Sequence, residues 1–334
     1  FQTLTRNRDA ATDLLKMVVT APRFDAEPLE RVRQQYLLNV KETEQDPQSI
    51  AWQAWMEDIL PGDPYSRRDG GTEATIAAIS ADDLHAAHRR IFNRETLQVS
   101  VVGDITAKEL GPLLDKLFGG LPETAAEQPE LPQAKPVMGP MVKVIDRDIP
   151  QSVIVFGTEG IKRDDPDFIP AFVMSEILGS GGLTSLLSEE IREKRGLAYS
   201  VYAYAQQFAG SGVLGFYAGC NPTKAIEVVE IIRSVLSDVA DNGMTHEEIE
   251  RAKGAVRGSL VLSQEDTGSR MSRIGKNEIV YGQVMDFDDI LKAISRVSAQ
   301  DIREIASEFL VKTPTLALVG PFKNESKFEK VLAK

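Results

Sequence analysis

The stretch "LGSGGLTSLLSEEIREKRGLAYSVYA", Leu178 to Ala203, contains the features that decide the fold of this chain. A glycine-rich run comes first, and a charged segment with apolar residues at helical spacing follows it. Gly196 then occupies the position at which helices commonly end. The residues after Gly196 are small, aromatic and β-branched, as in strands. The stretch therefore predicts a helix that ends at a glycine and leads directly into a strand.

The segments around this stretch predict further strands and helices. The run "PDFIPAFVMSEILG" before it is typical of a buried helix, and "GSGVLGFYAGC" after it predicts a strand paired with the first one as a hairpin. Two earlier segments, "MVKVIDRDI" and "QSVIVFGTEG", alternate like strands. Further helices are predicted at 222–242, 246–262 and about 285–295, followed by a terminal helix–strand–helix. Strands grouped with helices predict an α+β fold with a mixed or antiparallel sheet and helices packed on one face.

The chain contains an internal repeat. The segment "ISADDLHAAHRRIFNRETLQVSVVGD" begins at Ile79, and "VSAQDIREIASEFLVKTPTLALVGP" begins at Val297. Each predicts a serine-capped helix followed by a short β-rich run that ends in "VVG" or "LVG". A second pair of long charged helices starts near Phe24 and Met244, separated by nearly the same distance of about 220 residues. We therefore expect two homologous units.

The repeat sets the expected domain boundaries. The segment "LPETAAEQPELPQAKPVMGP" is rich in Pro, Ala and Glu, which is typical of a linker. We expect a first unit at 1–124, a linker at 125–140 and a second unit at 141–334. Alignment of the two units predicts that the first lacks roughly 80 residues at its N-terminal side.

Composition excludes several classes of protein. The chain has 334 residues, a formal net charge of −12 and a pI of about 4.9, which argues against nucleic acid and anionic membrane surfaces as partners. Its single cysteine, Cys220, excludes an intrachain disulfide and a cysteine-based zinc site. The sequence has no run of about 18 apolar residues, so it predicts no membrane span. The compartment is left unknown.

The chain resembles the pitrilysin/insulinase-type zinc metallopeptidase family, in particular its bacterial two-subunit members. The resemblance rests on "LGSGGLTSLLSEEIREKRGLAYSVYA", on "LERVRQQYLLNVKETEQDP" and on "DPYSRRDGGTEATIAAISADDLHAAHRRIFNRETLQVSVVGD", and it extends over essentially the whole chain. Family members bind zinc through an inverted His-x-x-Glu-His motif and a later Glu in their first unit. Their second unit contributes an Arg and a Tyr, seven residues apart, to the substrate.

The zinc ligands of the family are not matched in this sequence. The three histidines, His85, His88 and His246, do not form the motif, and we expect His85 and His88 to face solvent. The resemblance places the third ligand at Asn39, and an amide is a poorer zinc ligand than a carboxylate. The acidic residue that supports this ligand aligns with Val32, and a shift of one turn would instead place Glu42 at the ligand position. The resemblance therefore implies no metal site in this chain, with zinc in a partner subunit.

The second-unit residues of the family are matched. Arg192 and Tyr199 are seven apart, and the resemblance implies that both are catalytic. A phenol can donate a hydrogen bond to an oxyanion, and a guanidinium offers several fixed donors to a carbonyl. Without the resemblance, Arg192 would be a helix-terminal charge and Tyr199 a half-buried strand residue. We expect Gly181, Gly182 and Leu183 to contact the substrate; this glycine run follows a helix, which argues against a phosphate-binding loop. The resemblance also predicts an Arg near Leu186, which this chain lacks.

The resemblance implies a zinc-less subunit of a metalloendopeptidase that acts on unstructured peptides. It would form a heterodimer, or a dimer of heterodimers, with a homologous zinc-bearing subunit around an acidic chamber, and bind substrate partly by strand addition. The bacterial periplasm is favoured by analogy, with the cytoplasm second. Two alternatives are a complete homodimeric zinc peptidase whose motif lies upstream of Phe1, and a non-catalytic scaffold like the core proteins of respiratory complexes.

Overall fold

The fold is described from a computed structural model, which covers residues 1–126, 130 and 132–333. Part of the predicted linker, 127–129 and 131, lies outside the described residues. The chain forms two compact units, and both are assembled from separate stretches of sequence. Unit 1 comprises Phe1–Lys41, Gly70–Leu131 and Val261–Met285, and unit 2 comprises Glu42–Asp69, Pro132–Leu260 and Asp286–Lys334.

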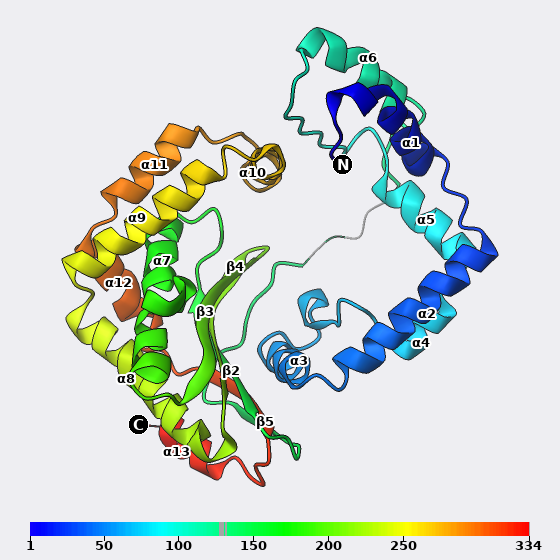
Figure 1. Ribbon diagram of the computed structural model, residues 1–334. Coiled ribbons are helices and arrows are strands. Elements are labelled where there is room, and N and C mark those ends of the chain that lie inside the picture. Colours follow the sequence, from blue (N-terminus) through cyan, green and yellow to red (C-terminus); the bar gives the residue numbers. More distant parts are fainter. Residues whose placement is uncertain (127–129, 131, 334) are drawn as a thin grey trace. The chain divides into compact units, whose positions relative to one another are not determined.

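Unit 2 contains a mixed five-stranded sheet with the strand order β1-β5-β2-β4-β3 (Figure 1). Strands β1 and β5 are parallel, and the pairs β2–β5, β2–β4 and β3–β4 are antiparallel. The predicted hairpin and terminal strand are confirmed, so the α+β class follows from the sequence. The strands are β1 (Val142–Asp146), β2 (Ser152–Gly160), β3 (Ala198–Phe208), β4 (Ser211–Cys220) and β5 (Thr315–Gly320).

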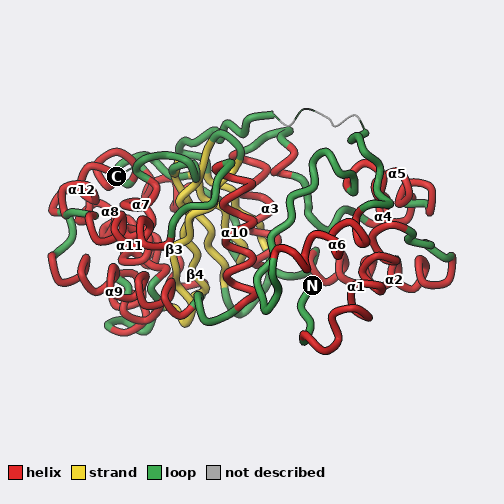
Figure 2. Tube along the Cα trace, turned by 90° about the horizontal axis from the view of Figure 1, so that it is seen from above, coloured by secondary structure: helices red, strands yellow, loops and turns green. Residues whose placement is uncertain are grey.

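Helices from the predicted second unit cover one face of this sheet, as expected. Side chains such as Ile154, Phe216 and Leu318 point toward them and form the larger apolar core. Figures 1 and 2 show α7 and α8 on this side of the strands. The elements are α7 (Phe168–Ser175), η3 (Glu176–Ser180), η4 (Gly182–Thr184), η5 (Ser188–Glu193), η6 (Pro222–Lys224), α8 (Ala225–Asn242), α9 (His246–Leu262), α11 (Phe287–Arg296), α12 (Ala299–Phe309) and α13 (Ser326–Leu332).

The opposite face of the sheet is covered by α3 (Pro47–Ile59), which comes from the predicted first unit. Alternation along the strands turns Val153 and Val155 toward this helix, where they pack against Trp55. Trp55 is fully buried, and its indole N–H donates to the carbonyl of Thr315 at 3.0 Å. The compact units therefore differ from the predicted homologous units at 1–124 and 141–334. Homology and compactness are separate properties, so the division into homologous units stays a prediction.

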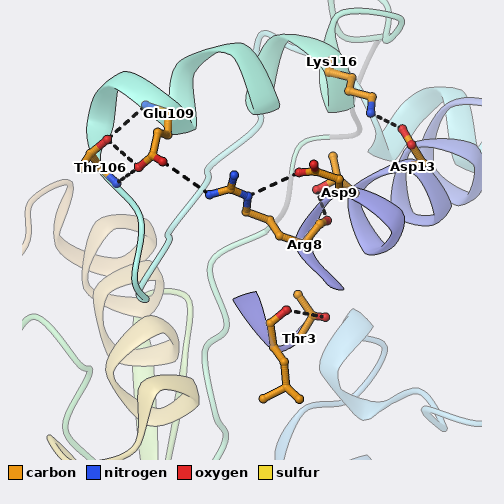
Figure 3. A network of polar contacts seen from close by, with 9 residues as sticks. Thr3, Arg8, Asp9, Asp13, Thr106, Glu109 and Lys116 are labelled. Carbon is orange, nitrogen blue, oxygen red and sulfur yellow. Dashed lines mark hydrogen bonds and ion pairs between the residues drawn. The ribbon is translucent and has the colours of Figure 1, made fainter. Parts of the chain in front are cut away.

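Unit 1 is helical over its described residues. Its helices α1 and α6 are joined by ion pairs, Lys116 with Asp13 and Arg8 with Glu109 at 3.8 Å (Figure 3). Thr106 and Glu109 form a capping box at the start of α6. The elements are η1 (Thr5–Asn7), α1 (Arg8–Thr20), α2 (Ala26–Thr43, which continues into unit 2), α4 (Glu73–Ala78), α5 (Ala81–Ile91), α6 (Ala107–Phe118) and α10 (Thr267–Tyr281), while η2 (Pro64–Ser66) lies in unit 2.

Two local predictions about unit 1 are wrong. The run at 97–103, expected to be β-rich, has no strand assignment, whereas its sequence counterpart is β5. A strand needs a neighbour to pair its backbone groups, and β5 lies between β1 and β2. The histidines expected to face solvent are half-buried instead. The imidazole of His88 lies 2.7 Å from the carbonyl of Val19, and the ring of His85 meets that of Phe24 edge to face. Both therefore have structural contacts.

Candidate functional site

The stretch from Glu176 to Gly196 is built from two short π-helical segments on either side of a glycine turn. In η3, the amide of Gly181 donates to the carbonyl of Glu176 at 2.9 Å. In η5, the amide of Lys194 donates to the carbonyl of Glu189 at 2.9 Å. These are bonds across five residues, one more than in an α-helix, and such turns are frequent at functional sites. The sequence predicts helices here but does not distinguish the wider π form.

Tyr199 lies at a β-bulge at the start of β3. Ala198 pairs with Cys220, and Ser200 pairs with the next residue of β4, Gly219, so Tyr199 has no partner of its own. A bulge redirects the extra side chain away from the regular alternation of the strand. Tyr199 is 75% exposed, in contrast to the half-buried strand residue that a purely structural role predicts.

Arg192 and Tyr199 are brought together. The guanidinium carbon of Arg192 lies 4.7 Å from the centre of the Tyr199 ring, within the range of a cation–π contact. Gly196, at φ +61°, lets the chain turn between the helical segment and β3. The Arg192 side chain is one-third exposed, and its Nε lies 3.3 Å from Glu193. The pair thus presents a phenol hydroxyl and guanidinium N–H donors at one end of the sheet.

The predicted substrate-contacting residues lie in the turn between the π segments. Gly182 has φ +73° and open space where a Cβ would be, and Leu183 is exposed. Gly181 is required for packing instead, because a Cβ there would lie 2.6 Å from the carbonyl oxygen of Glu176. The turn can therefore present a bare backbone and one apolar side chain, although no contact with a substrate is part of the structure.

The outer edge of β3 is partly covered at this site. The hydroxyl of Ser180 donates to the carbonyl of Ala203 at 2.9 Å, and that of Ser188 reaches the carbonyl of Val201 at 3.5 Å. Gly179 packs so closely that a Cβ would lie 2.2 Å from the amide nitrogen of Ala203. Strand addition along this part of β3 would have to displace these hydroxyl contacts.

Glu176 is a candidate residue that sequence reasoning missed. Burial raises the pKa of its carboxyl, which lies beside the glycine turn; a Cβ on Gly181 would be 3.7 Å from its Oε2. The only signal in the sequence is an acidic residue inside the apolar run "FVMSEILG".

Replacement of Glu176 by Gln is expected to stabilise the chain at neutral pH. Because the folded pKa is raised, the carboxyl favours folding only below its unfolded pKa of about 4.3, and this contribution is lost as the pH rises. The variant should therefore unfold at higher denaturant concentration than the wild type near pH 7, and the difference should vanish below about pH 4. Glu308→Gln, at an exposed position on α12, is the control. A difference that is independent of pH would contradict the burial argument.

The residues aligned with the family's zinc ligands do not fit a metal. Asn39 and Val32 lie on the exposed side of α2, and Glu42 follows Lys41 near its end, also exposed. Among the residues that the structure describes, no group of three or more His, Cys, Asp or Glu side chains is arranged to hold a metal ion. At the two aligned positions, an amide and a valine offer zinc none of its usual Cys, His, Asp or Glu ligands.

Comparison with known proteins identifies the family. Residues 78–256 match the family model of the peptidase M16 inactive domain. An uncharacterized zinc protease of Streptomyces coelicolor is 35% identical over 321 residues, which cover 94% of this chain and 70% of that protein. The chain therefore belongs to the M16 peptidase family, the pitrilysin/insulinase-type family that the sequence resembles, and it is related to zinc proteases.

Solved structures share the fold. The peptidase M16 inactive domain from Pseudomonas fluorescens superposes with a TM-score of 0.87 at 23% identity, over 96% of this chain and 76% of that one. A chain of complex III2 from Candida albicans gives a TM-score of 0.77 at 15% identity, over 99% of this chain and 82% of that one. At these identities the likeness concerns the fold. Across the described residues, none of the helices combines the length and apolar character that a membrane crossing needs.

Proposed function

We propose that this chain is the zinc-less subunit of an M16 metalloendopeptidase and supplies Arg192 and Tyr199 to a zinc-bearing homologous partner. The observation that carries the proposal is the contact of the Arg192 guanidinium with the ring of a bulged, exposed Tyr199. A strand residue turned out of its ladder and stacked under a cation has little structural role, whereas both groups suit substrate binding.

The proposed mechanism assigns one task to each side chain. Tyr199 donates its phenol proton in a hydrogen bond to the substrate carbonyl oxygen as negative charge develops on it. Arg192 supports the ring through the cation–π contact and offers its remaining N–H donors to a neighbouring substrate carbonyl. Unstructured peptides are the proposed substrates, because an extended backbone exposes its carbonyl groups to such donors. The water attack belongs to the partner, since the α2 residues of this chain do not fit a metal.

We also propose that the chain is built from two homologous units. Ser80 with Asp83 and Ser298 with Asp301 form the same capping box, and in each the backbone amide of the Asp donates to the serine hydroxyl at 3.2 Å. The helices that follow, α5 and α12, are both 11 residues long. Matching caps at matching positions support a duplication.

The helices α3 and α10 extend this correspondence. Asp46 caps α3 through the amide of Ser49 at 2.7 Å, and Asp266 caps α10 through that of Ser269 at 2.6 Å. In unit 2, α3 packs on β5, and in unit 1 the hydroxyl of Ser100, within 97–103, donates to the carbonyl of Met271 in α10 at 3.1 Å. Each helix thus contacts the terminal extended segment of the other half of the sequence.

Mixing experiments test the proposed function. The chain is combined with a zinc-bearing M16 subunit from the same genome, and hydrolysis of an unstructured fluorogenic peptide is followed. The expected result is a stable complex that cleaves the peptide at least 10-fold faster than the zinc-bearing subunit alone. A complex that forms with no gain in hydrolysis would favour the scaffold alternative. If no zinc-bearing M16 subunit of the genome bound the chain, the proposed pairing would be wrong.

A further inference from the structure

Two tyrosines on the β3–β4 hairpin lie face to face on the side of the sheet that carries α3. Tyr202 pairs directly with Tyr217 in the strand register. Their ring centres are 4.8 Å apart, and their planes differ by 17°. Both side chains are half-buried, so each ring keeps an accessible part. We call this pair the tyrosine shelf.

The tyrosine shelf is the outer end of a connected series of aromatic rings. From the buried Trp55 the series runs through Trp52 at 5.4 Å and Tyr204 at 5.3 Å to Tyr202 at 6.2 Å. Gly215 leaves room for the Tyr204 ring, since a Cβ there would lie 2.1 Å from Tyr204 Cζ. The α3 residue Gln48 donates to the hydroxyl of Tyr202 at 3.1 Å. The shelf is therefore held in position by the core of unit 2.

The shelf is adjacent to the proposed catalytic pair along the hairpin. The ladder pair next to Tyr202 and Tyr217 on the same face is Ser200 with Gly219, and the bulged Tyr199 directly precedes Ser200. Gly219 has no side chain, and a Cβ there would lie 3.0 Å from Nε2 of Gln151 and 3.3 Å from the hydroxyl of Tyr217, so these two groups lie over the glycine beside the shelf. Tyr202 is two residues beyond Ser200 and three beyond Tyr199, and an extended chain advances about 3.3 Å per residue, so the shelf lies about two to three residues from the bulge.

We propose that the tyrosine shelf is a specificity subsite that takes an aromatic side chain of the peptide substrate, about two to three residues from the bond that is cleaved. The position of this subsite relative to the cleaved bond rests on the proposed function of Arg192 and Tyr199. An aromatic side chain extends the stacked series by one ring, with the geometry that favours offset or tilted contacts between ring centres about 4.5–7 Å apart.

The chemistry of the shelf favours an aromatic ring over an aliphatic side chain. Two rings fixed near parallel have a preset geometry, so binding costs little side-chain freedom in the protein. A branched aliphatic side chain buries comparable area but lacks the ring–ring electrostatic term. Gln48 donates to the hydroxyl of Tyr202 and so fixes its position, and the ring is the recognition element in this proposal.

Peptide binding to the full chain tests this subsite without hydrolysis. Four dye-labelled, unstructured peptides carry Phe, Leu, Arg or Ala at a single central position, and their affinities are measured by fluorescence anisotropy. The Phe peptide should bind the wild type about 5- to 10-fold more tightly than the Ala peptide. Tyr202→Ala and Tyr217→Ala should each remove this preference, whereas Tyr202→Phe should keep it.

The control is Tyr36→Ala, which removes an exposed tyrosine from α2 and should leave the Phe preference intact. Circular dichroism melting shows whether each variant is folded. Tyr202→Phe keeps the ring and its packing, so it tests the preference without loss of the fold. Equal affinity for all four peptides, absence of binding, preference for Leu or Arg, or a preference retained in both alanine variants overturns the subsite.

The subsite and the proposed function fail separately. Arg192→Ala should leave the ratio of Phe to Ala affinities unchanged, because that residue contacts the backbone in our account. If Tyr199→Phe has no effect on hydrolysis while the shelf preference persists, the proposed function fails and the shelf stands as a peptide-binding surface. If hydrolysis depends on Tyr199 and no aromatic preference exists, only the shelf fails.

Discussion

Replacement of Tyr199 by Phe is expected to lower the turnover number of the reconstituted complex by roughly 10- to 1000-fold, the range for loss of one oxyanion donor. The change removes only the phenol hydroxyl and keeps the ring under the Arg192 guanidinium. Because the hydroxyl acts as charge develops, kcat should fall while KM changes little. Stopped and continuous peptide hydrolysis assays with saturating substrate measure this effect.

The matched control is Tyr36→Phe, which removes an exposed phenol hydroxyl in unit 1 and should leave kcat unchanged. Arg192→Lys is the complementary variant. It keeps a positive charge near the ring but lacks the planar fork, so it should raise KM more than it lowers kcat. Wild-type turnover in Tyr199→Phe would return Tyr199 to a purely structural role.

Replacement of Trp55 by Ala is expected to lower the free energy of unfolding by about 3–5 kcal/mol. Trp55 is fully buried between α3 and the sheet, and a Cβ on Gly157 would lie 2.7 Å from its Cζ2, so the ring fills a space shaped by a glycine. The variant also leaves the carbonyl of Thr315 without the indole donor. Urea denaturation followed by circular dichroism measures the change.

Trp52→Ala is the control on the same helix. Trp52 is only partly buried, at the rim of the smaller apolar core. Its replacement should therefore lower the free energy of unfolding clearly less than replacement of Trp55 does. If both variants lowered the free energy of unfolding by the same small amount, α3 would not be part of the core of unit 2. A large loss only in Trp55→Ala would support the assembly of that unit from two distant stretches of sequence.

The sequence was sufficient for those parts of the fold that local pattern controls. Alternation in "QSVIVFGTEG" predicted β2, and the serine cap at Ser298 predicted the start of α12. The local pattern could not predict which distant segments pack against one another. Nothing in the spacing of Trp55 indicates that its partner is Thr315, because burial on the far face of a sheet depends on which segment covers it.

The residues of the candidate site come from the resemblance, whereas their geometry comes from the structure. The resemblance supplied Arg192 and Tyr199, and their spacing is compatible with many relative positions. The bulge at Tyr199 depends on the register of β4, in which Ala198 and Ser200 pair with Cys220 and Gly219. Burial raises the pKa of the Glu176 carboxyl. A single acidic residue in an apolar run of sequence does not show that its side chain will be buried.

The most direct test of a zinc-less subunit is the peptidase activity of the isolated chain after incubation with zinc. We expect no hydrolysis of unstructured peptides above the buffer rate, and hydrolysis when the zinc-bearing partner is added. The basis for this prediction is that the resemblance places Asn39 and Val32, which are not zinc ligands, at the positions of acidic residues in the family. Zinc-dependent turnover by the purified chain alone, abolished by a chelator and restored by zinc, would contradict it.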